Sequence, residues 1–198
     1  MNFLAHAHLS FLQPHILIGN MINDFVKGKK QFEYPSSIQY GIQLHRAIDH
    51  FTDNHALTHE MKAFFKPHYR LYSGVFTDVV YDHFLANDIT EFATEDALKD
   101  FAHSSYQILE ENFSLLPPSF QRVLPYMVKQ DWFYFYRSRA GIERSFQGLA
   151  QRSVYLEESA VAFDIFNTYY NEMQLLYAGF YPDLKTFAAH QLQQLLNT

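Results

Sequence analysis

Apolar residues recur along this chain at the three- and four-residue spacing of amphipathic helices. Sustained alternation of apolar and polar residues, which is typical of strands, is missing from the sequence. The pattern therefore predicts an all-α fold of about eight helices, with a single domain over residues 1–198. Gly, Pro, Ser and Thr positions suggest where helices begin and end. The expected helices cover residues 16–28, 35–51, 56–65, 77–85, 94–116, 119–132, 139–149 and 153–181, with a short helix after Pro182.

Composition restricts the chemistry that this fold can carry. The 198 residues include no cysteine, which excludes disulfides, zinc–thiolate sites, iron–sulfur clusters and thiol nucleophiles. Any metal must therefore be held by His, Asp, Glu, Asn or water, and the eleven histidines make such a site worth seeking. Aromatic residues make up 18% of the chain, so we expect a core or groove rich in rings.

The net charge of −6 argues against nucleic-acid binding, which usually requires a basic domain. The charge is uneven, with eight acids and one lysine in residues 82–111 but six bases and two acids in residues 122–152. The amino terminus lacks a positively charged segment before its apolar residues, and no apolar run is long enough to span a membrane. These features predict a cytoplasmic protein with no membrane contact.

Three segments place carboxylates and histidines beside apolar helix stripes. His45 and Asp49 are four residues apart, so they share a helix face, while Asp82 and His83 lie on another expected helix and Asp24 on a third. Carboxylates cannot be buried and charged unless they are paired or bind a metal. One hypothesis is therefore a bundle interior where three helices direct Asp and His at one ion. Mixed imidazole and carboxylate ligands suit Mn²⁺, Fe²⁺, Mg²⁺ or Zn²⁺, and the many carboxylates favour Mn²⁺ or Mg²⁺.

Such an ion could polarise a phosphoryl oxygen and lower the pKa of a bound water, and Arg46 and Lys27 lie close enough in sequence to neutralise phosphate oxygens. The alternative is that these acids and histidines are solvated helix surface. His6 and His8 are two residues apart and face different sides of a helix, so at most one would be a ligand. We expect the other histidines to be surface or packing residues: His8, His15, His50, His55, His59, His68, His103 and His190.

Four ordered segments together resemble the acyl carrier protein phosphodiesterase family, also called holo-acyl carrier protein hydrolases. They are MNFLAHAHLS at 1–10, GNMINDFVKG at 19–28, GIQLHRAIDHFTDNH at 41–55 and TDVVYDHFLA at 77–86. A weaker similarity continues through residues 127–152 to the FYPDL near position 180, so the resemblance spans essentially the whole chain.

The resemblance implies an all-helical fold related to HD-domain metal-dependent phosphohydrolases. It implies hydrolysis of the phosphodiester between 4′-phosphopantetheine and a serine of holo-acyl carrier protein, within fatty acid metabolism. Mn²⁺ is the implied ion, with Mg²⁺ and Fe²⁺ as alternatives. The chain has no His-Asp dipeptide and instead has Asp-His at positions 49–50 and 82–83, so its ligand order departs from the HD pattern. The implied metal ligands are Asp24, His45, Asp49, Asp82 and His83, with His6 as a further candidate. We expect Asp24, His45 and Arg46 to be the catalytic residues.

An acidic carrier protein would be repelled by the net charge of this chain, so the hypothesis requires a local basic patch. We prefer Lys27, Lys29 and Lys30, which adjoin the Asp24 segment, over the bases of residues 122–152. Two other functions stay open. The same scaffold could act on a nucleotide or another small phosphoester, which needs no docking face. A helical protein without catalytic activity could instead bind a ligand or partner in an aromatic groove, and it would bind no divalent ion.

Overall fold

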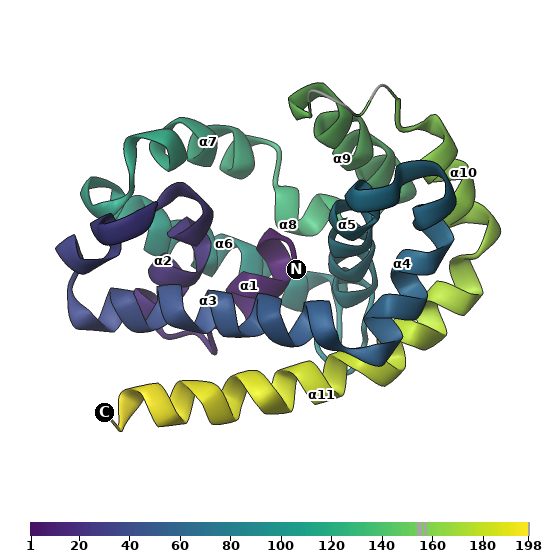
Figure 1. The fold of residues 1–198 in the computed structure, drawn as a ribbon. Coiled ribbons are helices and arrows are strands. Elements are labelled where there is room, and N and C mark those ends of the chain that lie inside the picture. Colours follow the sequence, from purple (N-terminus) through teal and green to yellow (C-terminus); the bar gives the residue numbers. More distant parts are fainter. Residues whose placement is uncertain (154–155, 157, 198) are drawn as a thin grey trace.

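The computed structural model describes residues 1–153, 156 and 158–197. Within these ranges the chain forms eleven α-helices and four short 3₁₀ segments with no strand, which confirms the all-α prediction (Figure 1). The helices are α1 (Phe3–His8), α2 (Pro14–Ile22), α3 (Ser36–Asn54), α4 (Ala56–Tyr69), α5 (Ser73–Ala86), α6 (Glu95–Glu111), α7 (Pro118–Lys129), α8 (Trp132–Phe135), α9 (Arg139–Arg152), α10 (Ala160–Thr168) and α11 (Tyr170–Leu196). The 3₁₀ segments are η1 (Asn23–Phe25), η2 (Gly28–Glu33), η3 (Arg70–Tyr72) and η4 (Phe113–Leu115).

Helices α2 and α3 lie in backbone contact, and two glycines make this possible. A Cβ atom on Gly19 would lie 2.1 Å from the carbonyl oxygen of Ile38, and one on Gly41 would lie 2.4 Å from the carbonyl oxygen of Ile16. Both distances are far below van der Waals contact, so any larger side chain would push the helices apart. The close approach places the main chain of Asn20 beside the middle of α3.

Helix α5 is the central element of the core. Eleven of its 14 residues are buried, as expected for a helix that is covered on most sides. Its Phe76 ring stacks on Phe65 of α4 at 5.6 Å and meets Phe146 of α9 edge-on at 4.9 Å. Phe146 in turn contacts Phe166 of α10. The high aromatic content of the sequence is therefore used largely for packing.

Several predicted helix starts are confirmed by their caps. Thr94 precedes α6 and its Oγ1 accepts a hydrogen bond from the Ala97 N–H at 3.1 Å. Ser138 precedes α9 and its Oγ accepts from the Gly141 N–H at 2.9 Å. Each cap satisfies an amide that has no partner within its own helix. Helix α3 likewise begins directly after Pro35, as predicted.

Other boundaries in the first half of the chain were wrong. The helix expected over 16–28 ends at Ile22 and gives way to η1 and η2, and α1 had not been predicted. The helix expected to begin at Thr77 begins one turn earlier, and the Thr77 hydroxyl donates to the carbonyl of Ser73 instead of capping. The predicted break before Pro67 does not occur, and α4 continues through Pro67 to Tyr69.

The second half of the chain also differs from the prediction. The helix expected over 94–116 ends at Glu111, and the one expected over 119–132 ends at Lys129. Asp131 adopts a left-handed conformation with φ of 45°, so the chain turns there before α8 begins. The region expected to form one helix over 153–181 begins partly outside the described residues. Its described part is two helices, α10 and α11, that meet at Tyr169.

Helix α11 continues through Pro182 to Leu196, so the predicted separate C-terminal helix is wrong. Its buried residues Leu184, Ala188 and Leu192 recur at four-residue spacing and face the core. Figure 1 shows α11 running beneath α3, and the two helices are in extensive contact. Packing of this apolar stripe thus outweighs the helix-breaking tendency of one proline.

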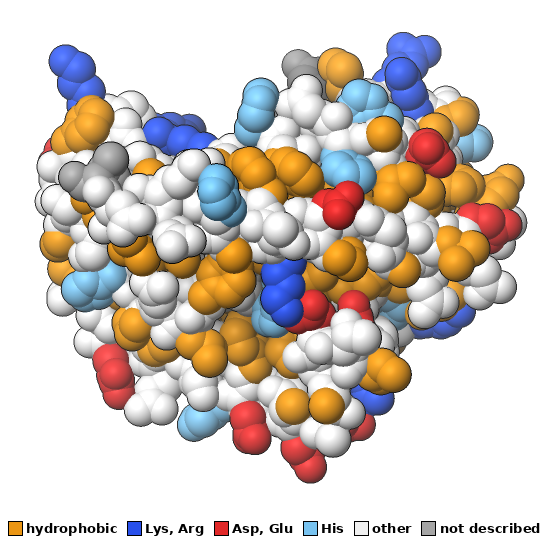
Figure 2. All heavy atoms as spheres, turned by 90° about the horizontal axis from the view of Figure 1, so that it is seen from below, with side chains coloured by type: hydrophobic (Ala, Val, Ile, Leu, Met, Phe, Trp, Pro, Cys, Tyr) orange, Lys and Arg blue, Asp and Glu red, His pale blue; other side chains and the backbone are white. Residues whose placement is uncertain are grey.

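Within residues 1–153, 156 and 158–197, none of the helices combines the length and apolar character that a membrane crossing requires. On the face seen from below in Figure 2, hydrophobic side chains are interspersed with charged and histidine side chains. The Lys and Arg side chains visible there stand apart from one another. This face therefore shows no broad basic patch.

The contact between α2 and α3 predicts a specific sensitivity. Gly19→Ala should lower the free energy of unfolding by about 1–3 kcal/mol, the usual cost of overpacking a tight contact. Urea unfolding followed by circular dichroism measures this change. Gly148→Ala is the matched control, because a Cβ there meets nothing closer than an Arg152 guanidinium nitrogen at 3.9 Å. Equal stability of Gly19→Ala and the wild type would contradict the assigned contact.

Candidate functional site

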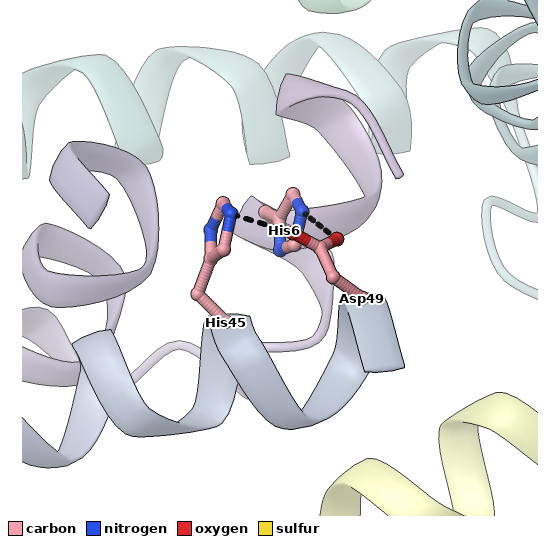
Figure 3. A group of neighbouring side chains, drawn as sticks. All are labelled: His6, His45 and Asp49. Carbon is pink, nitrogen blue, oxygen red and sulfur yellow. Dashed lines mark ion pairs between the residues drawn. The ribbon is translucent and has the colours of Figure 1, made fainter. Parts of the chain in front are cut away.

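The structure brings together His6 from α1 with His45 and Asp49 from α3 (Figure 3). Their potential ligand atoms all lie within 4.8 Å of one another. Both imidazoles are buried, and Asp49 is partly open to solvent with 39% of its side chain exposed. This metal-like cluster of three side chains, His6, His45 and Asp49, forms the core of the candidate site.

Asp82 holds the helix that carries His6. Its two carboxylate oxygens accept hydrogen bonds from the backbone amides of Leu4 at 2.8 Å and Ala5 at 3.1 Å. These amides belong to the first turn of α1, where helical partners are missing. Asp82 is completely buried; burial raises its pKa to about 7, although the two backbone hydrogen bonds act in the opposite direction. The structure thus places Asp82 beneath α1 and not within the metal-like cluster.

Asn20 fixes the orientation of both imidazoles. Its side-chain nitrogen donates to the carbonyl of His6 at 2.8 Å and to the hydroxyl of Ser10 at 3.1 Å, so its Oδ1 is an acceptor. The Nδ1 of His6, 2.8 Å from that Oδ1, must then be the protonated nitrogen. The Nδ1 of His45 donates to the main-chain carbonyl of Asn20 at 2.7 Å. In both neutral rings, Nε2 is therefore the atom that bears a lone pair.

Both Nε2 atoms face the carboxylate of Asp49. The His6 Nε2 lies 3.2 Å from Oδ1 and the His45 Nε2 lies 3.1 Å from Oδ2, and the rings stack with centroids 3.7 Å apart. The buried His6 Nε2 makes no hydrogen bond within the described part of the chain. Lone pairs of nitrogen and oxygen repel each other unless a proton or another cation lies between them. The donor set of two imidazoles and a carboxylate fits a divalent metal ion such as Mn²⁺, Fe²⁺ or Zn²⁺.

The electrostatics of the cluster agree with a need for positive charge. Burial lowers the pKa of His6 to about 4, and the charge of His45 adds to this effect, so His6 is neutral near pH 7. Burial also disfavours a charged His45, but hydrogen bonds with Asp24 and Asp49 prevail and raise its pKa to about 9. Burial alone would raise the pKa of Asp49, yet the hydrogen bond with His45 and the charge of the amino-terminal ammonium hold the pKa well below the ordinary value.

The α-ammonium group of Met1 adds a second positive charge. It lies 3.3 Å from Oδ1 of Asp49 and 3.1 Å from Oδ1 of Asp78. Burial lowers the pKa of this ammonium, but the two carboxylates outweigh burial and raise the pKa to about 11. Asp78 thereby joins α5 to the edge of the cluster.

Asp24 and Arg46 lie at the open side of the site. Asp24 is in η1, its side chain is 69% exposed, and its Oδ1 is 3.3 Å from the Nε2 of His45. The predicted proximity of Asp24 and His45 is therefore present. Arg46 donates from Nε to Asn23 Oδ1 at 3.0 Å and from Nη1 to Gln31 Oε1 at 2.7 Å. Arg46 thus ties η1 and η2 to α3, which keeps Asp24 beside His45.

His83 is not brought to the cluster. Its Nδ1 donates to the carbonyl of Tyr136 at 2.8 Å, and its Nε2 lies 3.0 Å from the hydroxyl of Tyr170. The ring also meets Phe84 and Phe166 edge-on, and burial lowers its pKa to about 4. The expectation that α5 supplies imidazole to the cluster is therefore not met; α1 supplies it instead, through His6.

The predicted basic trio of Lys27, Lys29 and Lys30 is exposed. The three lysines follow η1, which carries Asp24, and two of them lie in η2. The trio is therefore close in sequence to Asp24 and open to solvent.

Sequence reasoning missed the roles of Asn20 and Asp78. Asn20 is fully buried within the otherwise apolar run Ile16–Ile22. A polar side chain in such a run must find hydrogen-bond partners inside the protein, which is the signal that would have identified it. Asp78 has no comparable signal, since its partner is the distant amino terminus.

Comparisons with known proteins agree with the resemblance seen in the sequence. A protein family described as "Acyl carrier protein phosphodiesterase" matches residues 1–184. A Yersinia pestis protein of that name is 36% identical over 192 residues, which cover 96% of this chain and 99% of the relative. A Klebsiella pneumoniae protein of the same name is 32% identical over 191 residues, with the same coverage of both chains. No solved structure matches this chain.

The role of Asn20 generates a prediction. Asn20→Leu preserves approximate size but leaves the His6 carbonyl and Nδ1–H without their partner. The free energy of unfolding should fall by about 1–3 kcal/mol, the cost of buried groups left unpaired. Affinity for Mn²⁺, measured by electron paramagnetic resonance of the free ion, should fall by about 10–100-fold because His6 loses its orientation. Unchanged stability and Mn²⁺ affinity would contradict this role.

Proposed function

Because this chain belongs to the acyl carrier protein phosphodiesterase family, we propose that it hydrolyses the phosphodiester between 4′-phosphopantetheine and a serine of holo-acyl carrier protein. The products are apo-acyl carrier protein and 4′-phosphopantetheine. The names of the relatives support the substrate. Residues 1–198 act as one domain in this proposal, which agrees with relatives that match over nearly their whole length.

The observation that carries metal dependence is the convergence of two imidazole Nε2 atoms on one carboxylate. In this proposal His6, His45 and Asp49 hold a divalent ion, with Mn²⁺ favoured and Mg²⁺ or Fe²⁺ as alternatives. The bound ion would neutralise phosphate charge and lower the pKa of a water. Asp82 supports the site by holding α1, and His83 lies outside it.

Asp24 is the carboxylate of the site most open to solvent. Its pKa is lowered chiefly by the hydrogen bond with His45, so it is ionised near pH 7. An ionised, accessible carboxylate beside the metal-like cluster is suited either to complete the ligand set or to accept a proton from the attacking water. Arg46 holds the segment that carries Asp24, so we assign it a positioning role.

The lysine trio provides the docking face of this proposal. A protein substrate must place one phosphodiester at the cluster, and contacts outside the cluster must orient it. Lys27, Lys29 and Lys30 are exposed beside η1 and offer positive charge to an acidic carrier protein, in a chain whose overall charge is −6. Local attraction of this kind raises association rates despite an unfavourable net charge.

The metal proposal predicts that chelation abolishes hydrolysis of holo-acyl carrier protein and that Mn²⁺ restores it. His6→Ala and Asp49→Ala should reduce hydrolysis to the background rate, since each removes a ligand atom. Release of 4′-phosphopantetheine, followed by mass spectrometry, measures this. His103→Ala, a change to an exposed histidine on α6, should behave as the wild type. Full activity in the chelated wild-type protein would refute metal dependence.

The docking proposal predicts a split between substrates. Changing Lys27, Lys29 and Lys30 together to Glu should raise KM for holo-acyl carrier protein and spare hydrolysis of bis(p-nitrophenyl) phosphate, because only the protein substrate needs the docking face. Each lysine is also changed to Glu singly, and Lys66→Glu, the same change at an exposed lysine on α4, is the control. Equal losses on both substrates would show that the lysines act on the site itself and not on docking.

A further inference from the structure

A second feature of the molecule is a cavity of about 180 Å³. It lies between the start of α1 and helices α5, α8 and α9, and its walls include Phe3, Val79 and Trp132. The rings of Phe3 and Trp132 are 5.8 Å apart and form an apolar side. Polar groups of Gln130 and Ser145 lie among these walls.

This cavity borders the metal-like cluster. Phe3 is two residues from Met1, whose ammonium group lies 3.3 Å from Asp49. Val79 directly follows Asp78, which lies 3.1 Å from the same ammonium. Met1 and Asp78 thus lie at the cluster, and their chain neighbours Asn2, Phe3 and Val79 line the cavity. In Figure 1 the amino terminus lies beside α5, below α8.

The lining has a definite chemical character. It contains no Asp or Glu. It contains two exposed arginines, Arg144 and Arg152, and Arg144 lies over the ring of Phe135 at 5.2 Å. Arg144, Ser145 and Gln130 thus offer hydrogen-bond donors next to apolar walls. This combination suits a chain whose methyl and methylene groups contact the apolar walls and whose amide carbonyls accept hydrogen bonds from the donors.

We propose that this cavity, the arm pocket, binds the pantetheine portion of the prosthetic arm while its phosphodiester lies at the metal-like cluster. This inference rests on the proposed function and specifies which part of the substrate is recognised. Apolar walls match the methyl and methylene groups, and the donors match the amide carbonyls. Since pockets for whole ligands usually measure about 300–1,000 Å³, the arm pocket takes one segment of the arm and the remainder crosses its rim.

A nucleotide suits the arm pocket less well. Ribose hydroxyls are commonly held by a carboxylate, and the lining provides none. Titration with pantetheine and with a nucleotide therefore distinguishes the two kinds of ligand.

The arm pocket can be tested without catalysis because Trp132 is the single tryptophan of the chain. Adding pantetheine to the chelated protein should change tryptophan emission saturably. Ser145→Phe fills the arm pocket and should abolish the change. Gln147→Phe, the same substitution at an exposed position of α9 outside the lining, should preserve it. Circular dichroism checks that both variants fold. The titration of the wild-type protein tests pantetheine binding even if a variant does not fold.

Kinetics provide the second measurement. Ser145→Phe should raise KM for holo-acyl carrier protein at least about 10-fold, a typical effect of losing apolar contacts in a pocket, and leave hydrolysis of bis(p-nitrophenyl) phosphate unchanged. Three results would overturn the arm pocket. Tryptophan emission would stay unchanged with pantetheine, it would change equally in Ser145→Phe, or it would change with adenosine monophosphate alone. Pantetheine binding by a protein that fails to cleave holo-acyl carrier protein would instead refute the proposed function and retain the arm pocket.

Discussion

The backbone contact between Gly19 and Gly41 is the constraint on which the site depends. It allows α2 and α3 to approach until the main-chain carbonyl of Asn20 reaches the Nδ1 of His45 at 2.7 Å. The side chain of the same residue, Asn20, then reaches the Nδ1 of His6 at 2.8 Å. A single methyl group at either glycine would separate the two helices and lengthen the hydrogen bonds that orient both imidazoles. The chemistry of the cluster is therefore set by how closely two helices pack.

Helix α1 shows how the second imidazole of the cluster is held. Six residues are too few for a stable isolated helix, so α1 needs partners from elsewhere in the fold. Asp82 binds its first amides, and Asn20 binds the carbonyl of His6. Both partners are fully buried, where hydrogen bonds are directional and unpaired groups are costly. Two polar side chains thus fix the position of His6 more firmly than the intrinsic preferences of α1.

The sequence predicted features that are local and missed those that arise from packing. Thr94 indicated the start of one helix, and the four-residue spacing of His45 and Asp49 correctly placed them on one face. Asp82 and His83 offer a similar local pattern, but their partners lie far along the chain at Leu4 and Tyr136, so their destinations depend on tertiary structure. Left-handed Asp131 and the continuous helix through Pro182 depend on neighbours that periodicity does not describe.

The geometry of the cluster requires a positive charge, which a proton or a metal ion can supply. Asn20 keeps a hydrogen on each Nδ1, which leaves the Nε2 lone pairs facing the oxygens of Asp49. A proton on His45 can relieve that repulsion, and a divalent ion can relieve it at both rings at once. Proton and ion compete for the same electron pairs, so binding the ion must release the proton. The partial exposure of Asp49 and the greater exposure of Asp24 leave one side of this charge open. That open side is where a phosphodiester, itself negatively charged, would meet the cluster.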